Sequence, residues 1–360
     1  MAKITFELDG KMVEAEEGET IWQVADRHKT KIPHLCWLPE PGYRADGNCR
    51  ACMVEIEGER VLAASCQRIP SNGMKVKTAS ERAKKSREMV FELLLADQPA
   101  KADSHDPNSK FWNWVGAMNV KPESRFPRAD KPEADYSHSA IAVNLDACIK
   151  CGLCVRACRE VQHNDVIGMA YRGHNSVPVF DFDAQMGEST CVACGECVQA
   201  CPTGALMESN LIDKSNGKRV HFEDRTVDTL CPFCGVGCQT TAYVKDDKIL
   251  YIDGRDGPAN ENRLCVKGRF GFDYIHHPDR LTVPLIRRDD APKRGDIDVD
   301  PRNPWNVFRK ATWEEALDKA AGGLKKILER DGGDALAGFG SAKCSNEEAY
   351  LFQKLIRQGF

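Results

Sequence analysis

Seventeen cysteines, sixteen of which fall into four groups of four, constrain the fold of this 360-residue chain more than any other feature of its sequence. The groups are Cys36, Cys49, Cys52 and Cys66; Cys148, Cys151, Cys154 and Cys158; Cys191, Cys194, Cys197 and Cys201; and Cys231, Cys234, Cys238 and Cys265, with Cys344 outside them. Cysteines at this density form either the disulfides of small secreted domains or metal sites. The first 20 residues carry no basic segment followed by an apolar one, as a secretion signal would. We therefore expect metal binding and a cytoplasmic location.

The second and third groups share the spacing C-x2-C-x2-C-x3-C, and each cysteine of the third follows its counterpart by 43 residues. This internal duplication, which ends in Cys201-Pro202, is the pattern of bacterial two-cluster ferredoxins. Three closely spaced thiolates bind one [4Fe–4S] cluster, while the fourth cysteine points away and binds the other. The predicted sets are Cys148, Cys151, Cys154 and Cys201, and Cys191, Cys194, Cys197 and Cys158. A pair of zinc sites is the alternative, but zinc motifs usually separate two short cysteine pairs by a longer loop.

The fourth group pairs a C-x2-C-x3-C loop at 231–238 with Cys265, after 26 intervening residues. Four thiolates in this arrangement suit one further [4Fe–4S] cluster. Lys267 lies two residues beyond Cys265, where it is either close to the cluster or a solvated surface charge. The first group differs from the plant-type ferredoxin spacing, but it also has a glycine-containing loop ending in a C-x2-C pair and a distant fourth cysteine, Cys66. Structural zinc is its alternative.

Apolar periodicity, turn residues and capping residues predict the secondary structure. The predicted elements are hairpins at 3–17, 53–65 and 241–254, helices at 19–28, 80–96, 312–330 and from 345 onward, and a short strand at 335–340. The first two hairpins and the first helix together indicate a β-grasp ferredoxin-like module. The residues at 97–140 are dominated by Pro, Asp, Lys and Ser, and we expect a surface linker there with Trp112 and Trp114 as anchors.

Three segments carry a resemblance to known families. TLCPFCGVGC, from Thr229, and NRLCVKGRFGFDYIHHPDRLTVPLIR, from Asn262, resemble the opening of the molybdenum or tungsten bis-pterin oxidoreductases, specifically the formate dehydrogenases. GSAKCSNEEAYLFQKLIR, from Gly340, is similar to the second domain of that family. The Cys36 group resembles the [2Fe–2S] module of complex I large iron–sulfur subunits, iron-only hydrogenases and NAD-linked formate dehydrogenases. The whole chain looks like the front part of the alpha subunit of cytosolic NAD-dependent formate dehydrogenase.

The resemblance implies an α+β multidomain fold with the modules in a fixed order. The expected domains are a β-grasp [2Fe–2S] ferredoxin-like domain at 1–79, a helix and linker at 80–140, a bacterial two-[4Fe–4S] ferredoxin-like domain at 141–215, the [4Fe–4S] N-terminal domain of a molybdopterin oxidoreductase at 226–290, and the start of its pterin-binding α/β domain at 291–360. The implied cofactors are one [2Fe–2S] cluster, three [4Fe–4S] clusters and bis-molybdopterin guanine dinucleotide with Mo or W.

The resemblance also implies a role for the chain in electron transfer. Lys267 would relay electrons between the Cys231 cluster and the pterin, and diaphorase subunits with FMN and further clusters would exchange those electrons with NAD. Formate, or CO2 in the reverse direction, would be the substrate. The metal-ligating cysteine or selenocysteine of the family lies beyond Phe360 in its subunits, so we expect no catalytic residue among these 360.

Some residues depart from the family pattern or are open to two interpretations. Related proteins often bind an extra cluster through H-x3-C-x2-C-x5-C, but the segment DPNSKFWNW after His105 contains no cysteine, so we expect that cluster to be absent and His105 to be a solvated linker residue. Cys344 is predicted to be a buried structural thiol at the end of the 335–340 strand. Arg50, Arg156 and Arg159 place positive charge near the cysteine groups or are ordinary solvated arginines.

Composition limits the other function classes. A net charge of −4 does not suggest binding to nucleic acid, and no apolar run is long enough to span a membrane. The alternatives are a non-catalytic electron-transfer subunit of a complex I or hydrogenase type assembly, an iron-only hydrogenase, and a zinc-stapled binding protein. The CPFCGVGC segment is wrong for an iron-only hydrogenase. Nitrate reductases begin with similar segments, so the prediction of formate as the substrate depends only on how close the resemblance is.

Overall fold

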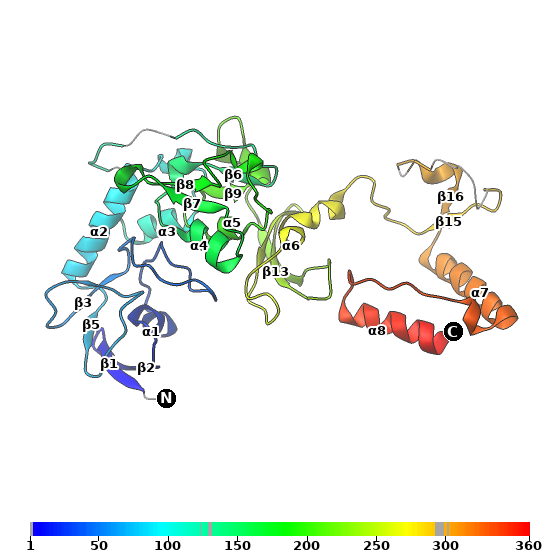
Figure 1. The fold of residues 1–360 in the computed structure, drawn as a ribbon, viewed down its shortest axis with the longest axis horizontal. Helices are drawn as coiled ribbons and strands as arrows, with labels where there is room; N and C mark the ends of the chain where they lie inside the picture. The colour runs from blue at the N-terminus through cyan, green and yellow to red at the C-terminus, as the bar shows by residue number, and fades with distance from the viewer. Residues whose placement is uncertain (1–2, 123, 129–131, 292–298, 301) are drawn as a thin grey trace.

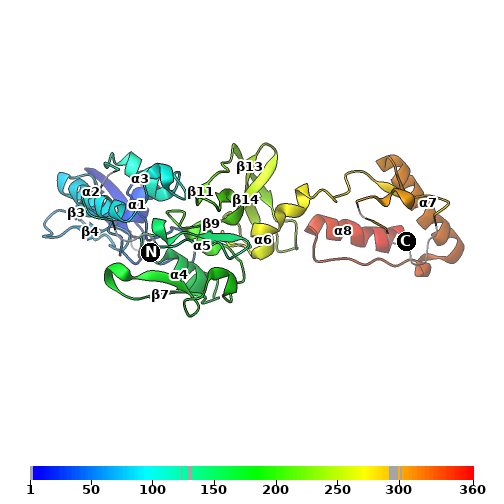
Figure 2. The same cartoon turned by 90° about the horizontal axis from the view of Figure 1, so that it is seen from above.

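The structure, a computed structural model, describes residues 3–122, 124–128, 132–291, 299–300 and 302–360. The molecule is elongated: the N-terminal sheet lies at one end, and the helices α7 (Trp313–Asp331) and α8 (Asn346–Lys354) lie at the other (Figures 1 and 2). No helix in the described ranges combines the length and apolar character needed to cross a membrane.

The N-terminal module is a five-stranded sheet with one packed helix. Its elements are β1 (Ile4–Leu8), β2 (Lys11–Ala15), α1 (Ile21–Arg27), β3 (Met53–Ile56), β4 (Ala63–Ala64) and β5 (Lys75–Lys77). The strand order is β2-β1-β5-β3-β4, with β5 parallel to β1 and antiparallel to β3. Asp9 and Gly10 both take positive φ, as the tight turn between β1 and β2 requires. Ile21 and Val24 of α1 share a core with Phe6, which completes the predicted β-grasp arrangement.

The second predicted hairpin forms in a shortened version. The Glu57-Gly58 turn is present, because the Glu59 amide donates to the Ile56 carbonyl at 3.1 Å and Gly58 has positive φ. The chain beyond the turn pairs with β3 only at Ala63–Ala64, however. The return strand is therefore two residues long rather than the longer strand that the alternation predicts.

A helical layer follows the sheet. The predicted helix is α2 (Glu81–Ala96), whose N-cap Ser80 accepts a hydrogen bond from the Ala83 amide. A second helix, α3 (Lys110–Ala117), lies within the predicted linker and is followed by the less regular part of that segment. Phe91 of α2 stacks on Phe111 of α3, with ring centroids 5.8 Å apart. The predicted linker therefore contains core-forming residues, because its aromatic side chains find a partner on α2 that local propensity does not reveal.

The cysteine-rich central module consists of short elements arranged in two similar halves. They are β6 (Ile141–Val143), η2 (Leu145–Ala147), α4 (Leu153–Arg156) continued by the π-turn η3 (Ala157–Val161), β7 (Ile167–Ala170), η4 (Gly173–Asn175), β8 (Val177–Phe180), η5 (Met186–Glu188), α5 (Glu196–Ala200), β9 (Leu206–Glu208), η6 (Ser209–Leu211), β10 (Ile212–Asp213) and β11 (Lys218–Arg219). Gly152 and Gly195, which begin α4 and α5, have the same backbone angles, φ 73° and ψ 6°. The duplication in sequence is thus a duplication in backbone geometry.

A three-stranded antiparallel sheet opens the next module. It comprises β12 (Arg225–Leu230), β13 (Gln239–Lys245) and β14 (Lys248–Gly254), followed by α6 (Val266–Phe270) and η7 (Gly271–His276). The predicted 241–254 hairpin is the β13–β14 pair, and Asp246 and Asp247 both have positive φ in its turn. The 231–238 cysteine loop joins β12 to β13, so the sheet holds both ends of that loop.

The C-terminal residues contain the two predicted helices without the predicted strand. The elements are β15 (Leu285–Arg287), η8 (Pro304–Asn306), β16 (Phe308–Lys310), α7, η9 (Gly333–Ala335), α8 and η10 (Leu355–Gly359). Thr312 caps α7 and Ser345 forms a capping box with Glu348 at α8, as predicted. The strand predicted at 335–340 is wrong, because no strand among the described residues pairs with it. Residues 292–298 and 301 of the predicted 291–360 domain lie outside the described residues.

Candidate iron–sulfur sites

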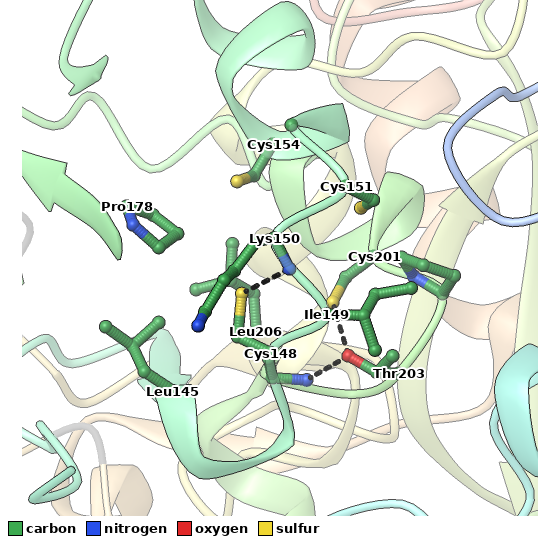
Figure 3. Close-up of a pocket in the computed structure, with 13 residues that line it drawn as sticks. Leu145, Cys148, Ile149, Lys150, Cys151, Cys154, Pro178, Cys201, Thr203 and Leu206 are labelled. Carbon is green, nitrogen blue, oxygen red and sulfur yellow. Dashed lines mark hydrogen bonds between the residues drawn. The ribbon is translucent and has the colours of Figure 1, made fainter. Parts of the chain in front are cut away.

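Four cysteines from both halves of the central module line one cavity. Cys148, Cys151 and Cys154 approach it from the loop before α4 and from α4 itself, and Cys201 approaches it from the end of α5 (Figure 3). Leu145, Ile149, Pro178 and Leu206 complete a mostly apolar wall. The structure therefore brings Cys201 to the cysteines of the first repeat, although it lies about 50 residues from them in the sequence.

A second cavity has the reciprocal composition. Cys191, Cys194 and Cys197 line it together with Cys158, which η3 supplies from the first repeat. Val166, Ile167 and Met186 form its apolar wall. The structure thus assembles the two sets of four that the spacing predicts, while the ligation of metal by either set stays a prediction.

Backbone amides point at the cysteine sulfurs in both halves. The amide of Lys150 lies 3.3 Å from Cys148 Sγ, and the amide of Ala193 lies 3.4 Å from Cys191 Sγ. Lys150 and Ala193 hold left-handed backbone angles, φ 57° and 54°, which turn successive N–H groups toward the cavity. Such inward-facing amides stabilise negative charge on thiolate and sulfide.

Burial disfavours ionisation of the thiols in these cavities unless a cation lies beside them. Burial raises the pKa of the Cys151, Cys154 and Cys197 thiols well above the usual value, and neighbouring cysteines raise it further. A cluster of iron ions offsets that cost because it binds the thiolate directly. Four thiols, an apolar wall and inward-facing amides together fit a [4Fe–4S] cluster. Among the described residues, no three His, Cys, Asp or Glu side chains converge on a single metal-ion position.

The first cysteine group lies in the β-grasp module, with Cys36, Cys49 and Cys52 between α1 and β3 and Cys66 just after β4. Cys52 Sγ is 3.4 Å from Cys66 Sγ, and the Cys49 amide donates to Cys36 Sγ at 3.4 Å. Cys36, Cys52 and Cys66 are almost fully buried. These contacts bring Cys52 close to Cys66 and Cys49 close to Cys36. Four cysteines grouped in this way fit a [2Fe–2S] cluster.

The fourth group is more open than the other three. The Cys231 amide donates to the Cys238 carbonyl at 2.9 Å, which closes the loop, and Cys265 is the N-cap residue of α6. Cys234 and Cys265 are exposed. Lys267 is exposed in the first turn of α6, so its side chain is accessible beside Cys265, and its relay role stays a prediction.

Cys344 lies next to this fourth group instead of in a core. The Gly235 amide donates to the Ala342 carbonyl at 2.9 Å, which holds the segment before α8 against the cysteine loop. Cys344 is partly exposed, and its Sγ lies 2.9 Å from the Ser341 carbonyl oxygen. The predicted buried thiol is therefore wrong, because the strand expected to bury it does not form.

His105 is another correction. Its side chain is 0% exposed, and Nδ1 lies 2.6 Å from the Gly204 carbonyl oxygen, so the residue is part of the interior and not a solvated linker residue. The neighbouring Trp112 is also buried and donates through Nε1 to Ser104 Oγ at 3.1 Å. Residues 104–112 therefore pack against the cysteine-rich module, since Gly204 closely follows Cys201 in the chain.

The arginines near the cysteines divide into two kinds. Arg50 is exposed, and Arg159 is exposed and pairs with Asp165, which matches the solvated interpretation. Arg156 is buried and donates to the Cys36 and Cys151 carbonyls, at 2.5 and 3.5 Å, so it reaches both the first cysteine group and the Cys148 set.

Arg269, a residue that the sequence analysis did not single out, joins the fourth group's module to the Cys191 set. Its side chain is fully buried, and Nε donates to the Cys194 carbonyl at 2.8 Å. The same guanidinium pairs with Asp253 at 2.9 Å and donates to Gln199 at 2.7 Å. In the sequence, Arg269 is marked only by its position four residues after Cys265. That position does not reveal which residues its side chain contacts.

A buried group of ionisable side chains lies beside the Cys36 loop. Lys110 Nζ is 2.7 Å from His34 Nε2. Burial lowers the pKa of Lys110 to about 8 and that of His34 to about 4, and it raises the pKa of Glu40 to about 7. His34 is therefore neutral near pH 7, whereas Glu40 and Lys110 have pKa values within about one unit of it.

Comparison with known proteins identifies the class of protein that these sites define. Residues 1–81 match the family described as a 2Fe-2S iron-sulfur cluster binding domain, and residues 147–205 match a 4Fe-4S dicluster domain. Residues 224–277 match the molybdopterin oxidoreductase Fe4S4 domain, and residues 280–360 match molybdopterin oxidoreductase. The predicted fold class and module order are confirmed, and residues 224–360 are similar to the molybdopterin oxidoreductases.

Individual relatives span several functions. The chain is 31% identical over 357 residues to the NADPH-Fe(3+) oxidoreductase subunit alpha of Geobacter sulfurreducens, covering 98% of this chain and 39% of that protein. It is 30% identical to the putative formate dehydrogenase YrhE of Bacillus subtilis and 33% identical to a subunit of an NADH-quinone oxidoreductase of Rhizobium meliloti, each match covering 99% of this chain and 39% of the relative. The chain thus spans about two fifths of the length of these relatives.

A solved structure matches part of the chain. The crystal structure of an NAD+-reducing [NiFe]-hydrogenase in the H2-reduced state matches with a TM-score of 0.52 and 28% identity, over 61% of this chain and 93% of that one.

Proposed function

We propose that this chain is the iron–sulfur electron-transfer portion of a Mo- or W-dependent, NAD-linked formate dehydrogenase. It would pass electrons between a bis-pterin metal centre and a diaphorase partner that carries FMN and further clusters. Support comes from the molybdopterin oxidoreductase matches at 224–360 and from the relatives described as putative formate dehydrogenases.

The proposed ligands are the four sets of cysteines. They are Cys36, Cys49, Cys52 and Cys66 for one [2Fe–2S] cluster, and, for three [4Fe–4S] clusters, Cys148, Cys151, Cys154 and Cys201; Cys191, Cys194, Cys197 and Cys158; and Cys231, Cys234, Cys238 and Cys265. The observation that carries the proposal is the exchange of Cys158 and Cys201 between two adjacent cavities, since it matches the ligand pattern of two-cluster ferredoxins.

Contacts between the groups support a linear order of electron transfer. Arg269 links the fourth group's module to Cys194, and Arg156 links the Cys148 set to Cys36. Electrons leaving the fourth group would therefore reach the Cys191 set, then the Cys148 set, and finally the Cys36 group. In this order the Cys36 group is a terminal cluster rather than a branch.

The bis-pterin cofactor, when bound, supplies the chemistry that removes two electrons and a proton from formate. Lys267 is the residue of this chain that would contact it, because the side chain is exposed next to Cys265 and carries a positive charge suited to an anionic pterin. Mo and W are both compatible with the residues present.

A second candidate is a non-catalytic electron-transfer subunit of a complex I or hydrogenase type assembly. The match to the NAD+-reducing hydrogenase covers 93% of that chain, and the relative from Rhizobium meliloti is part of an NADH-quinone oxidoreductase. In this case the clusters and their order would be the same, while the fourth group would lack a pterin neighbour.

Iron, acid-labile sulfide, Mo, W and Zn, measured on the natural full-length protein purified without oxygen, test both candidates. One [2Fe–2S] and three [4Fe–4S] clusters require about fourteen iron atoms per chain. That content with near one Mo or W, together with cluster reduction by formate, is the result expected. The same iron content without Mo or W would favour the second candidate, and zinc in place of iron would overturn both.

A further inference from the structure

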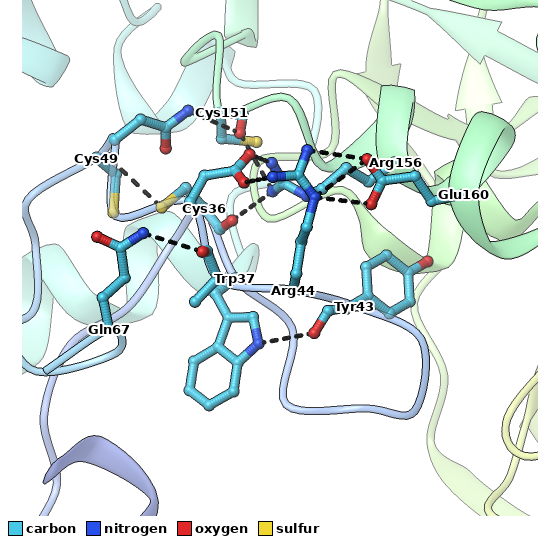
Figure 4. A network of polar contacts seen from close by, with 12 residues as sticks. Cys36, Trp37, Tyr43, Arg44, Cys49, Gln67, Cys151, Arg156 and Glu160 are labelled. Atoms are coloured by element: carbon cyan, nitrogen blue, oxygen red, sulfur yellow. Dashed lines mark hydrogen bonds and ion pairs between the residues drawn. The ribbon is translucent and has the colours of Figure 1, made fainter. Parts of the chain in front are cut away.

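Arg156 occupies an unusual position between two cysteine groups. It lies between Cys154 and Cys158 in the sequence, yet its guanidinium reaches into the N-terminal module (Figure 4). Nη2 donates to the Cys36 carbonyl at 2.5 Å and to the Cys151 carbonyl at 3.5 Å. One planar group thus touches the backbone of a proposed ligand in each of two clusters.

The counter-charge of Arg156 comes from the N-terminal module. Nη1 forms an ion pair with Asp46, in the loop between Cys36 and Cys49. Only 3% of Arg156 is exposed, so the pair is largely withdrawn from water. A buried guanidinium is costly unless its donors are satisfied, and an apolar side chain would join the two modules with less desolvation. A role beyond packing would explain why a charge is kept there.

Neighbouring contacts fix the same interface. Asn48 Nδ2 donates to the Cys151 carbonyl at 3.3 Å. Arg44 pairs with Asp46 and Glu160, both at 3.0 Å, and its side chain is 67% exposed. Arg44 therefore shares the ion-pair network and the charge of Arg156 without its buried position between the proposed ligands, which makes it a matched control.

The hydrogen bonds of Arg156 form a short connection between the two groups. Electron tunnelling weakens steeply with distance, and it is more efficient along covalent and hydrogen bonds than across van der Waals gaps. The path from the Cys36 carbonyl through the guanidinium to the Cys151 carbonyl contains only such bonds. The positive charge also stabilises the reduced, more negative state of a nearby cluster, while Asp46 offsets part of that effect.

We propose that Arg156 is a positioning residue for electron transfer: it fixes the Cys36 group against the Cys148 set, provides the hydrogen-bonded connection between them and, balanced by Asp46, sets their reduction potentials. In the step it serves, one electron leaves one cluster and enters the other, and no proton moves. The inference rests on the proposed cluster ligation but is independent of whether the whole protein oxidises formate.

Four variants of the natural full-length protein test the proposal: R156K, R156Q, D46N and the control R44Q. The readouts are iron content, midpoint potentials of the [2Fe–2S] and [4Fe–4S] EPR signals in a redox titration, and spin–spin broadening between the two reduced clusters. R156Q removes the buried positive charge, while Asp46 keeps only its exposed partner Arg44, and should shift the potentials to more negative values. D46N leaves Arg156 uncompensated and should shift them to more positive values. R156K should keep the potentials near those of the wild type but weaken the broadening.

Opposite shifts in R156Q and D46N, with little change in R44Q, support the proposal, because a purely structural contact gives no sign reversal. Shifts of the same sign, or shifts no larger than those of R44Q, overturn it. If R156Q binds less iron than the wild type, the proposal is tested by the potentials of D46N and the broadening of R156K alone. A wild-type protein without iron would instead overturn the proposed function, so the two failures are distinguishable.

Discussion

Individual buried charges hold the cysteine groups in place, and Arg269 is the strongest example. Its guanidinium contacts Cys194, Gln199 and Asp253, and Tyr43 reaches the same network through Glu196. Because these partners come from separate modules, the loss of one side chain leaves several polar groups buried without a partner.

Replacement of Arg269 by Met keeps much of the volume and removes the charge. Breaking a buried ion pair from one side typically costs about 3–5 kcal/mol, and we expect a loss of unfolding free energy in that range. Denaturant unfolding under anaerobic conditions measures it. Lys245→Gln, at an exposed ion pair on β13, is the control and should change stability by less than about 1 kcal/mol. Equal effects of the two substitutions would contradict the role of Arg269.

His105 makes stability depend on pH. Burial lowers the pKa of His105 below its ordinary value of 6.5. The unfolded chain therefore binds more protons than the folded one as pH falls below about 6.5, and the free energy of unfolding decreases with it. His105→Gln removes this contribution, so its unfolding free energy should fall less than that of the wild type between pH 7.5 and about 5.5. Parallel pH curves for the two proteins would show that His105 is not responsible.

At the scale of elements, the duplication creates two similar turns with different surroundings. Gly152 and Gly195 have the same left-handed angles at the start of α4 and α5. A Cβ added at Gly152 would meet only Arg156 Nη1, at 3.5 Å, in ordinary contact, whereas one added at Gly195 would collide with the buried side chain of Arg269. The two halves are equivalent in backbone but not in packing.

Alanine at each glycine separates these effects. Gly152→Ala should cost about 1–2 kcal/mol, the strain of a left-handed alanine. Gly195→Ala should cost more, because Arg269 must also move away from Cys194. Denaturant unfolding gives the free energies, and iron content shows whether the Cys191 set is disturbed more than the Cys148 set. A smaller loss in Gly195→Ala than in Gly152→Ala would refute the proposed clash.

At the scale of the whole molecule, polar contacts connect three modules at one junction. Tyr43 of the N-terminal module donates to Glu196 of α5 at 2.8 Å, and Arg269 of α6 lies 3.6 Å from the same carboxylate. These groups are buried where the modules meet, so separating the modules breaks the hydrogen bond and the ion pair between them. We therefore expect the part of the chain up to α6 to unfold cooperatively.

Tyr43→Phe removes one hydroxyl from this junction. Leaving a buried acceptor without its donor costs about 1–3 kcal/mol, and the N-terminal module should become easier to cleave by a protease from the remainder. Tyr171→Phe, at an exposed tyrosine, serves as the control. Limited proteolysis and denaturant unfolding measure the two effects, and an unchanged cleavage pattern would argue against cooperative unfolding.

Features that depend on short-range spacing could be predicted from the amino-acid sequence. Loops of two or three residues between cysteines leave few ways to arrange the thiols, so the exchange of Cys158 and Cys201 was predictable. Turn and capping residues similarly located the β1–β2 and β13–β14 hairpins and the starts of α2, α7 and α8, because these depend on local backbone hydrogen bonds.

Which side chains are buried, and what they touch, followed from tertiary packing. His105, Arg156 and Arg269 are polar residues, and each is buried because a distant segment packs over it. The strand expected at 335–340, and with it the burial of Cys344, fails for the converse reason, since a strand requires a partner that local sequence does not supply. Unlike the exchanged cysteines, these side chains follow no periodicity or spacing from which their distant contacts could be inferred.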